Sequence, residues 1–379
     1  MKFPHLRAGL ILALVLVINL VGRASAGELD ITARAAIIIE AGTGRVIWEK
    51  NADEKNYPAS TTKIMTAMLA LENLSPRQEI FYTPNAELTE DTPLGILAGE
   101  RLTASELITG MLLESDNGAA VAIAEAVDGS VDSFARRMNK RAKLLDMQST
   151  HFVNPNGLPD ENHYSTVRDM AKLARAAMEN KDFREMVIQP KHYLKWSYPE
   201  KFTAIENTNK LLGKYEGMTG IKTGWTNAAG GCLAASAKRN GVELIVVLMK
   251  TPTADDRFSD ARKLLDYGFS HVKMVKGIDK ERVEKTVWVK NGTAARVKLH
   301  PVRDINYPLI NDEEASHYHL TYDVPNVLAA PLKGGETVGS VVINYDNKPV
   351  GNVPLVAEPV KEGFSFGSWL VGIFEKILI

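Results

Sequence analysis

Four residues near the start of the chain, Ser60-Thr61-Thr62-Lys63, combine a serine and a lysine three positions apart. In a helix this spacing places both side chains on one face, about one turn apart. A serine hydroxyl becomes a good nucleophile when a nearby base removes its proton. A lysine serves as that base when burial or a neighbouring cation lowers its pKa. The segment therefore predicts a serine nucleophile, Ser60, that is activated by Lys63.

Two more segments extend this chemistry. Ser115-Asp116-Asn117 falls on a break between two predicted helices, and Lys222-Thr223-Gly224 falls on a predicted strand, where Gly224 lets a ligand approach the backbone closely. The order Ser-x-x-Lys, Ser-x-Asn, Lys-Thr-Gly is the motif set of class A β-lactamases and penicillin-binding proteins. The three segments together predict acyl transfer, with Ser60, Lys63, Ser115 and Asn117 as the catalytic residues.

The elements that must position these residues follow from the hydrophobic pattern. A strand pair at the start, a helical middle and strands that return later predict one α/β layer domain whose sheet is completed by the returning chain. The pattern predicts strands at 36–39, 45–48, 220–226, 232–237 and 242–249, and helices at 60–74, 105–113, 119–127, 131–145, 167–178 and 256–267.

Local signals mark several of these boundaries. Thr103 and Glu106 form a capping-box pattern at the start of the 105–113 helix. Asn240-Gly241 predicts a two-residue hairpin between the last two strands. Gly268 is expected to end the 256–267 helix as its C′ residue.

After about residue 272 the pattern changes to short strands separated by turns. These strands are predicted at 283–290, 294–299, 319–324 and 337–345, and they indicate an all-β module. The predicted fold class is therefore α/β and multi-domain, with an α/β layer domain followed by a C-terminal all-β domain.

At this point the sequence resembles a known family, the low-molecular-mass penicillin-binding proteins that act as serine D-alanyl-D-alanine carboxypeptidases. The resemblance covers almost the whole chain after residue 26. The segment 59–66 is close to the family's nucleophile segment, and Asn207–Leu212 with Gly220–Thr226 matches its third-motif region. The resemblance implies a β-lactamase/transpeptidase-like catalytic domain, with an antiparallel sheet flanked by helices. It also implies a peptidoglycan stem peptide ending in D-Ala-D-Ala as substrate, with β-lactam antibiotics as covalent inhibitors.

The resemblance also implies roles for individual residues. Ser60 would form the acyl-enzyme, and Lys63 would be its base. Ser115 would bridge Lys63 and Lys222 and pass a proton to the leaving amine, while Asn117 would contact the acyl-side peptide. The substrate-binding residues would be Lys222, Thr223, Gly224, Trp225 and Arg257, with the Trp225 N–H in the oxyanion hole and Thr223 and Arg257 on the terminal carboxylate.

Asp116 departs from the family pattern. Carboxypeptidases of this type more often have a small residue there, whereas class A β-lactamases have Ser-Asp-Asn, so a β-lactamase remains an alternative. The chain has no Glu-x-x-Leu-Asn segment of the kind that β-lactamases use for deacylation. A penicillin-sensing or wall-binding module without turnover is a further alternative. The sequence leaves open whether Asp116 is structural or tunes Lys63.

The two ends of the chain carry targeting signals. Lys2 and Arg7 precede an apolar run, and Ala24-Ser25-Ala26 follows it as a cleavage site, so residues 1–26 are predicted to be a signal peptide. At the other end, 359–379 is predicted to form an amphipathic helix that lies in the membrane interface. We therefore expect an exported protein on the outer face of the cytoplasmic membrane.

Composition narrows the remaining possibilities. The 379 residues carry a formal net charge of −1, so no broad basic field favours nucleic acid. The single cysteine, Cys232, excludes an intrachain disulfide and a cysteine-built metal cage. His317 and His319 lack a third ligand, and no metal or other cofactor is expected. The predicted domains are a catalytic domain at 27–272 and a β-rich domain at 273–358, followed by the terminal helix.

Overall fold

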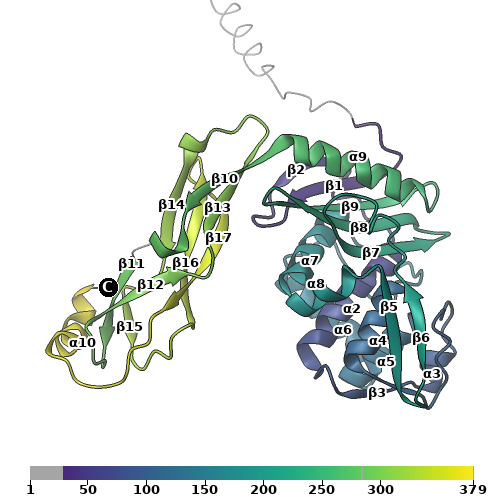
Figure 1. The fold of residues 1–379 in the computed structure, drawn as a ribbon, viewed down its shortest axis with the longest axis horizontal. Coiled ribbons are helices and arrows are strands. Elements are labelled where there is room, and N and C mark those ends of the chain that lie inside the picture. Colours follow the sequence, from purple (N-terminus) through teal and green to yellow (C-terminus); the bar gives the residue numbers. More distant parts are fainter. Residues whose placement is uncertain (1–28, 283–284, 379) are drawn as a thin grey trace, which may run out of the picture. The chain divides into compact units, whose positions relative to one another are not determined.

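The computed structural model describes residues 29–282 and 285–378. The predicted signal peptide, residues 1–26, lies outside the described residues. The part of the chain that carries the three motifs is built around a five-stranded antiparallel sheet (Figure 1). Its strand order is β2-β1-β9-β8-β7. The strands are β1 (Ala35–Glu40), β2 (Val46–Lys50), β7 (Met218–Thr226), β8 (Gly230–Arg239) and β9 (Val242–Thr251).

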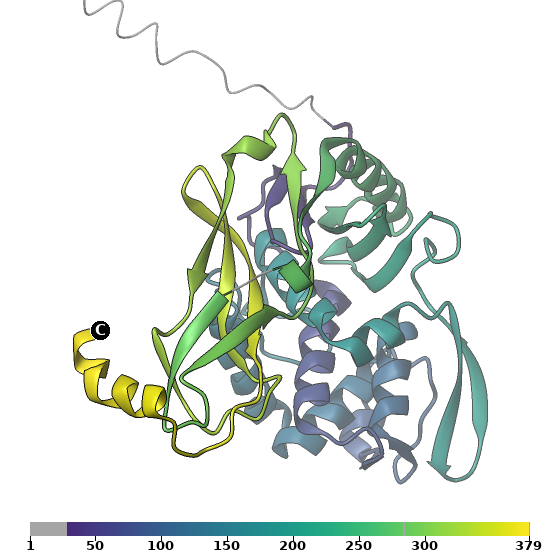
Figure 2. The ribbon, with the colours of Figure 1, turned by 60° about the vertical axis from the view of Figure 1, so that its left-hand side comes forward.

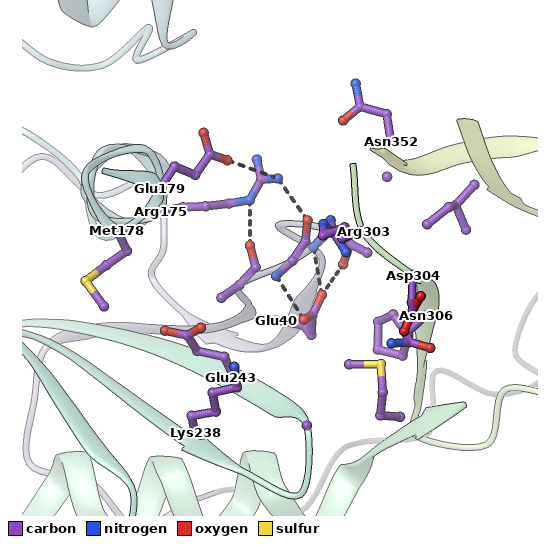
Figure 3. Close-up of a pocket in the computed structure, with 18 of the residues that line it drawn as sticks. Glu40, Arg175, Met178, Glu179, Lys238, Glu243, Arg303, Asp304, Asn306 and Asn352 are labelled. Atoms are coloured by element: carbon purple, nitrogen blue, oxygen red, sulfur yellow. Dashed lines mark hydrogen bonds and ion pairs between the residues drawn. The ribbon is translucent and has the colours of Figure 1, made fainter. Parts of the chain in front are cut away.

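The sheet brings the two ends of the catalytic region together as the sequence predicts. β1 pairs with β9, so the N-terminal strand lies beside the returning chain, and every residue of β1 is buried. The turn from β1 to β2 is held by Glu40, whose carboxylate accepts hydrogen bonds from the backbone N–H groups of Gly42 and Thr43. Arg175 donates to the carbonyl oxygens of Ala41 and Gly42, which fastens a helix to the same turn (Figure 3).

Helices cover both faces of this sheet (Figure 1). α9 (Asp256–His271) packs on β8 and β9, and α7 (Val167–Glu179) packs on β1 and β9 from the other side. The expectation that Gly268 ends the α9 helix is wrong, because the helix continues to His271. A Cβ at Gly268 would lie 2.6 Å from Leu244 Cδ1, so this glycine serves close packing between helix and sheet.

The helical region that follows Ser60 confirms the predicted helices with small shifts of their ends, and it adds two short helices that were not predicted, Pro84–Glu87 and Lys181–Val187. It contains α2 (Lys63–Asn73), α3 (Pro84–Glu87), α4 (Ala104–Leu113), α5 (Asn117–Asp128), α6 (Val131–Leu144) and α8 (Lys181–Val187). The predicted cap is present at α4, where the Thr103 side chain accepts from the Glu106 N–H. Eight of the eleven residues of α2 are buried, so this helix forms the centre of the core.

A four-stranded sheet in the same region was not predicted. Its order is β3-β4-β5-β6, and its strands are β3 (Glu79–Phe81), β4 (Arg101–Thr103), β5 (Lys191–Tyr198) and β6 (Phe202–Glu206). In β5 only Leu194 and Trp196 are buried, and the buried side packs on α4. Such a short alternating segment inside a helical stretch gives a weak strand signal, which explains the omission.

The C-terminal part is β-rich, as predicted. It has a two-stranded sheet, β10-β13, and a six-stranded sheet in the order β14-β16-β17-β12-β11-β15. The strands are β10 (Val272–Ile278), β11 (Lys285–Lys290), β12 (Arg296–Pro301), β13 (Ile305–Ile310), β14 (Tyr318–Asp323), β15 (Val327–Ala329), β16 (Thr337–Tyr345) and β17 (Lys348–Ala357). Val289, Leu299, Val341 and Leu355 belong to a hydrophobic core of its own.

A terminal helix is present as α10 (Phe366–Leu378), which Figure 2 shows in yellow at the end of the chain. It begins at Phe366 and not at residue 359, where the prediction placed its start. It packs against β11, with Ser368 and Val371 buried. Trp369 and Ile373 are each half exposed, at 51%. Among the described residues, no helix combines the length and the apolar character that crossing a membrane requires.

Candidate active site

The predicted nucleophile lies on a tight turn immediately before α2. Ser60 belongs to a 3-10 turn, Ala59–Thr62, and is partly exposed. Ala59 has a φ of +48°, a backbone conformation that costs a non-glycine residue energy and is concentrated at functional sites. The Thr61 hydroxyl donates to the Pro58 carbonyl at 2.6 Å and fixes the turn. The nucleophile therefore sits on a constrained backbone at the edge of the core.

His163 supports this turn from the opposite side. Its Nδ1 accepts a hydrogen bond from the Val153 N–H at 3.2 Å, so Nε2 carries the proton and donates to the Thr62 hydroxyl at 2.9 Å. Burial lowers the pKa of His163 to about 4. The imidazole is therefore neutral at ordinary pH and connects the turn with the loop around residue 153.

Lys63 is the central group of the site. It is fully buried, and its ammonium donates to Ser60 Oγ at 2.8 Å, Asn117 Oδ1 at 2.6 Å and the Asn156 carbonyl at 2.9 Å. Burial lowers the pKa of Lys63 to about 7, although the nearby charges of Asp116 and Asp91 oppose that change. At neutral pH a large fraction of this lysine is therefore an uncharged amine.

The Ser-x-Asn segment lies at the start of α5. Asn117 is its first residue, and its side-chain amide donates to the Glu90 carbonyl at 2.9 Å. Ser115 has a φ of +67° and lines the same cleft as Ser60. Among the described contacts, its hydroxyl is not hydrogen bonded to Lys63 or Lys222, so the expected bridge between the two lysines is not formed in this structure.

β7 carries the third motif along one side of the cleft. Lys222 is 1% exposed, and its Nζ donates to the Thr223 carbonyl at 3.1 Å. Burial first, then the charges of Lys63 and Arg257, lower its pKa well below the ordinary value. A Cβ on Gly224 would lie 2.9 Å from the Ser60 nitrogen, so β7 runs directly against the Ser60 turn, whereas the sequence predicted only that Gly224 lets a ligand approach the backbone.

Arg257, in the first turn of α9, reaches the same strand. Its Nη1 donates to the Gly224 carbonyl at 2.5 Å, whereas its Nε is buried and has no partner among the described residues. Burial lowers the pKa of its guanidinium. A buried donor without an acceptor is costly, and this one belongs to a side chain that lines the cleft.

All these elements meet at a cavity of about 500 Å³. Its lining includes seven of the nine predicted site residues, all except the fully buried Lys63 and Lys222: Ser60, Ser115, Asn117, Thr223, Gly224, Trp225 and Arg257. A larger cavity of about 850 Å³ is lined in part by Glu40, Arg175 and Glu243 and contains none of the predicted site residues. We take the smaller cavity as the candidate active site, because it contains the predicted nucleophile, Ser60.

Sequence reasoning missed several residues that shape the cleft. The Asn156 carbonyl contacts Lys63, but a backbone acceptor has no residue-type signal. Gly157 has a φ of +90°, and a Cβ there would lie 1.9 Å from the Ala59 carbonyl oxygen. Thr208 shares a hydrogen bond of 2.7 Å with the Thr223 hydroxyl. Only the tertiary structure places the segment 154–157 against Lys63.

Within residues 29–282 and 285–378, no three or more His, Cys, Asp and Glu side chains are grouped to hold a metal ion. Cys232 is buried and donates to the Tyr57 carbonyl at 3.5 Å, and burial raises its thiol pKa to about 11. The thiol is therefore protonated at neutral pH.

Comparisons with known proteins match both parts of the chain. Residues 22–253 match the family model of D-alanyl-D-alanine carboxypeptidases, peptidase family S11. Residues 269–362 match the model of the C-terminal domain of penicillin-binding protein 5.

Individual relatives extend over most of the chain. D-alanyl-D-alanine carboxypeptidase DacF of Bacillus subtilis is 31% identical over 355 residues, which cover 90% of this chain and 91% of the relative. D-alanyl-D-alanine carboxypeptidase DacC of Escherichia coli is also 31% identical, and the match covers 89% of this chain and 86% of the relative. The crystal structure of penicillin-binding protein 5 from Haemophilus influenzae superposes with a TM-score of 0.66 at 28% identity, and it covers 89% of this chain and all of that one.

Proposed function

The chain belongs to the D-alanyl-D-alanine carboxypeptidase family of serine hydrolases, and from that membership we propose how its cleft carries out the reaction. The protein is a serine D-alanyl-D-alanine carboxypeptidase, and the β-lactamase alternative is not favoured. We propose that the substrate is the peptidoglycan stem peptide and that Ser60 attacks the carbonyl of its penultimate D-alanine.

The contacts of Lys63 support its role as the base. A neutral lysine amine has two N–H donors and one lone pair. Asn117 Oδ1 and the Asn156 carbonyl can only accept, so they take the two N–H groups. The lone pair is then left to the Ser60 hydroxyl, 2.8 Å away. As the new ester bond forms, the serine proton moves to Lys63, whose pKa of about 7 suits a base at neutral pH.

The cationic side of the cleft suits the terminal carboxylate of the substrate. Arg257 offers a buried Nε that has no partner in the described part of the chain, and Thr223 offers a hydroxyl that shares a hydrogen bond with Thr208. The positive charges of Lys63 and Arg257 are close enough to Lys222 to lower its pKa. An entering carboxylate would favour the protonated form of Lys222, so substrate binding itself charges this lysine.

The developing oxyanion needs donors beside Ser60. We assign this role to the backbone N–H groups of Ser60 and Trp225, since Gly224 lets β7 approach the nucleophile turn. Removal of one such donor raises the barrier by about 3–4 kcal/mol in other enzymes.

Breakdown of the tetrahedral intermediate releases D-alanine when the C–N bond breaks. The proton held by Lys63 passes through Ser115 to the departing amine, which requires the Ser115 hydroxyl to turn toward Lys63 from its present position in the cleft. Asn117 holds the acyl-side peptide. A water molecule then attacks the ester carbonyl while Lys63 takes its proton. The bond between the carbonyl carbon and Ser60 Oγ breaks as that proton passes to Oγ, which releases the shortened peptide and restores Ser60.

The single observation that carries this proposal is the 2.8 Å contact between Lys63 and Ser60 in the cleft. The test is intact mass after incubation with benzylpenicillin, for the wild type and Ser60→Ala. We expect one covalent adduct on the wild type and none on the variant. Equal labelling of both proteins would contradict Ser60 as the nucleophile.

Two further measurements separate the alternatives. Release of D-alanine from diacetyl-Lys-D-Ala-D-Ala is expected for a carboxypeptidase, and its absence beside stable labelling would indicate a penicillin-sensing module. Rapid hydrolysis of benzylpenicillin in place of a long-lived adduct would favour a β-lactamase.

We also propose that the protein acts outside the cytoplasm, with its signal peptide removed after Ala26. The exposed Trp369 and Ile373 of α10 support attachment of this helix to a membrane surface. The domain limits at 272 and 358 stay predictions.

A further inference from the structure

The residue that departs from the family pattern, Asp116, has three hydrogen-bond partners and no exposure to solvent. Its Oδ1 accepts from the Ala119 N–H at 2.7 Å and from the Tyr82 hydroxyl at 3.3 Å, and its Oδ2 accepts from the Leu94 N–H at 3.0 Å. All three partners are donors, which is the environment of an ionised carboxylate. Burial opposes this by raising the pKa of Asp116, while the Ala119 and Leu94 N–H groups lower it.

These three partners come from three different segments. Ala119 lies in the first turn of α5, so Asp116 is the N-cap of that helix. Tyr82 follows β3 and is fully buried. Leu94 ends the segment 90–94, whose residues Asp91, Thr92 and Pro93 line the cleft. We call this segment the cleft wall.

The neighbouring residue holds the other end of the cleft wall. The Asn117 N–H donates to the Asp91 carbonyl at 3.2 Å, and its side chain donates to the Glu90 carbonyl. Asp116 and Asn117 therefore fasten the wall at both ends. The same Asn117 side chain accepts from Lys63, so a displaced wall would displace a direct partner of the base.

We propose that Asp116 is a positioning residue of this active site: its buried carboxylate holds the cleft wall against the start of α5 and acts as the buried counter-charge of Lys63. It touches no reacting atom and acts through Ser115, Asn117 and Lys63. This inference rests on the proposed function of Lys63 as the base.

The charges that surround Lys63 make the second part of the proposal testable. Asp116 and Asp91 both favour the charged form of Lys63. Asp116 is buried, whereas Asp91 is exposed at the cleft. Lys222 faces Lys63 from β7. His163, which contacts the other side of the Ala59–Thr62 turn, is neutral. Other charged or titratable groups act one step further away: Glu114 and Arg257 on Lys222, and Glu87 on Tyr82.

The experiment measures the rate of acylation by a fluorescent penicillin as a function of pH. In the wild type the rate should rise with pH through the pKa of Lys63, about 7. Asp116→Asn removes the counter-charge, so the midpoint should fall by about one pH unit. The maximal rate should fall by about tenfold to a hundredfold, because an amide cannot accept from all three donors and the wall moves.

Tyr82→Phe is the matched control. It removes the longest of the three hydrogen bonds but keeps the charge, so its midpoint should equal that of the wild type. If the Asp116→Asn protein folds and its midpoint is unchanged, Asp116 is not the counter-charge of Lys63, and its role is only structural.

Asp91→Asn keeps the proposal testable if Asp116→Asn does not fold. At about 1 M salt the screening length falls to about 3 Å, so an exposed charge loses its influence and a buried one keeps it. The midpoint of Asp91→Asn should then coincide with that of the wild type. A midpoint far below the wild type in high salt would assign the counter-charge to Asp91 and contradict the proposal. A wild type that is not labelled at all would instead contradict the proposed function.

Discussion

At the scale of single residues, the site depends on two lysines that the fold keeps out of water. Lys63 and Lys222 are 0% and 1% exposed, and burial is the largest cause of the lowered pKa of each. A buried ammonium is costly unless it is paired. The burial that suits Lys63 to its proposed role as the base therefore also reduces the stability of the folded protein, and such a loss of stability in favour of function is common at active sites.

This trade predicts a pH dependence of stability. Between the pKa of folded Lys63, about 7, and its ordinary value of 10.5, the unfolded chain binds a proton that the folded chain does not. The free energy of unfolding should therefore rise with pH in this window, by at most about 1.4 kcal/mol per pH unit for this group. Lys63→Met removes this contribution and should flatten the slope in urea unfolding. Lys143→Met, at an exposed position on α6, should keep the wild-type slope. An unchanged slope for Lys63→Met would contradict the lowered pKa.

At the scale of elements, glycines let the segments around the cleft approach one another. Gly224 brings β7 against the nucleophile turn, and Gly157 brings the loop that carries the Asn156 carbonyl to the other side of it. Gly118 does the same between α5 and α3, because a Cβ there would lie 2.0 Å from Tyr82 Oη and 2.4 Å from the Ala86 carbonyl oxygen. The active site is thus assembled from elements packed more closely than side chains normally permit.

Two glycines near opposite ends of α5 allow a matched test. Gly118→Ala should lower the free energy of unfolding by more than about 3 kcal/mol, because the backbone on both sides must move to relieve the overlap. Gly129→Ala meets nothing within 4 Å, although its φ is +75°, and it should cost about 1 kcal/mol. Thermal and urea unfolding of both variants measure the difference. Equal losses would show that close packing at Gly118 is not the constraint.

At the scale of the whole molecule, a catalytic region and a β-rich region follow one another in the chain, each with its own hydrophobic core. The last element, α10, buries Val371 but leaves Phe366, Trp369 and Ile373 at least half exposed. Aromatic and aliphatic side chains exposed on one short helix are typical of a segment that lies in a membrane interface.

Vesicle binding measures this property directly. Deletion of residues 364–379 should abolish sedimentation with phosphatidylethanolamine–phosphatidylglycerol vesicles and leave penicillin labelling intact, because the cleft lies in the other region. The double variant Trp369→Ser/Ile373→Ser should weaken binding in the full chain. Tyr322→Ser, which removes an exposed aromatic residue from β14, is the matched control and should bind like the wild type. Undiminished binding of the deletion variant would refute attachment through α10.

The sequence by itself determined the chemistry of this protein and most of its elements. The pairing of Ser60 with Lys63 could be predicted because helical spacing is a local property. The hairpin at Asn240-Gly241 could be predicted because turn residues have local conformational preferences. Only the tertiary structure decided which groups surround Lys63. The Asn156 carbonyl, the His163 imidazole and the cleft wall held by Asp116 come from distant segments, and nothing in their own neighbourhoods specifies a lysine as their partner. The role of Gly268 was mispredicted for the same reason, because it depends on the contact of α9 with Leu244 in β9. Burial and contact between distant segments, which lower the pKa of Lys63, are properties of the packed chain.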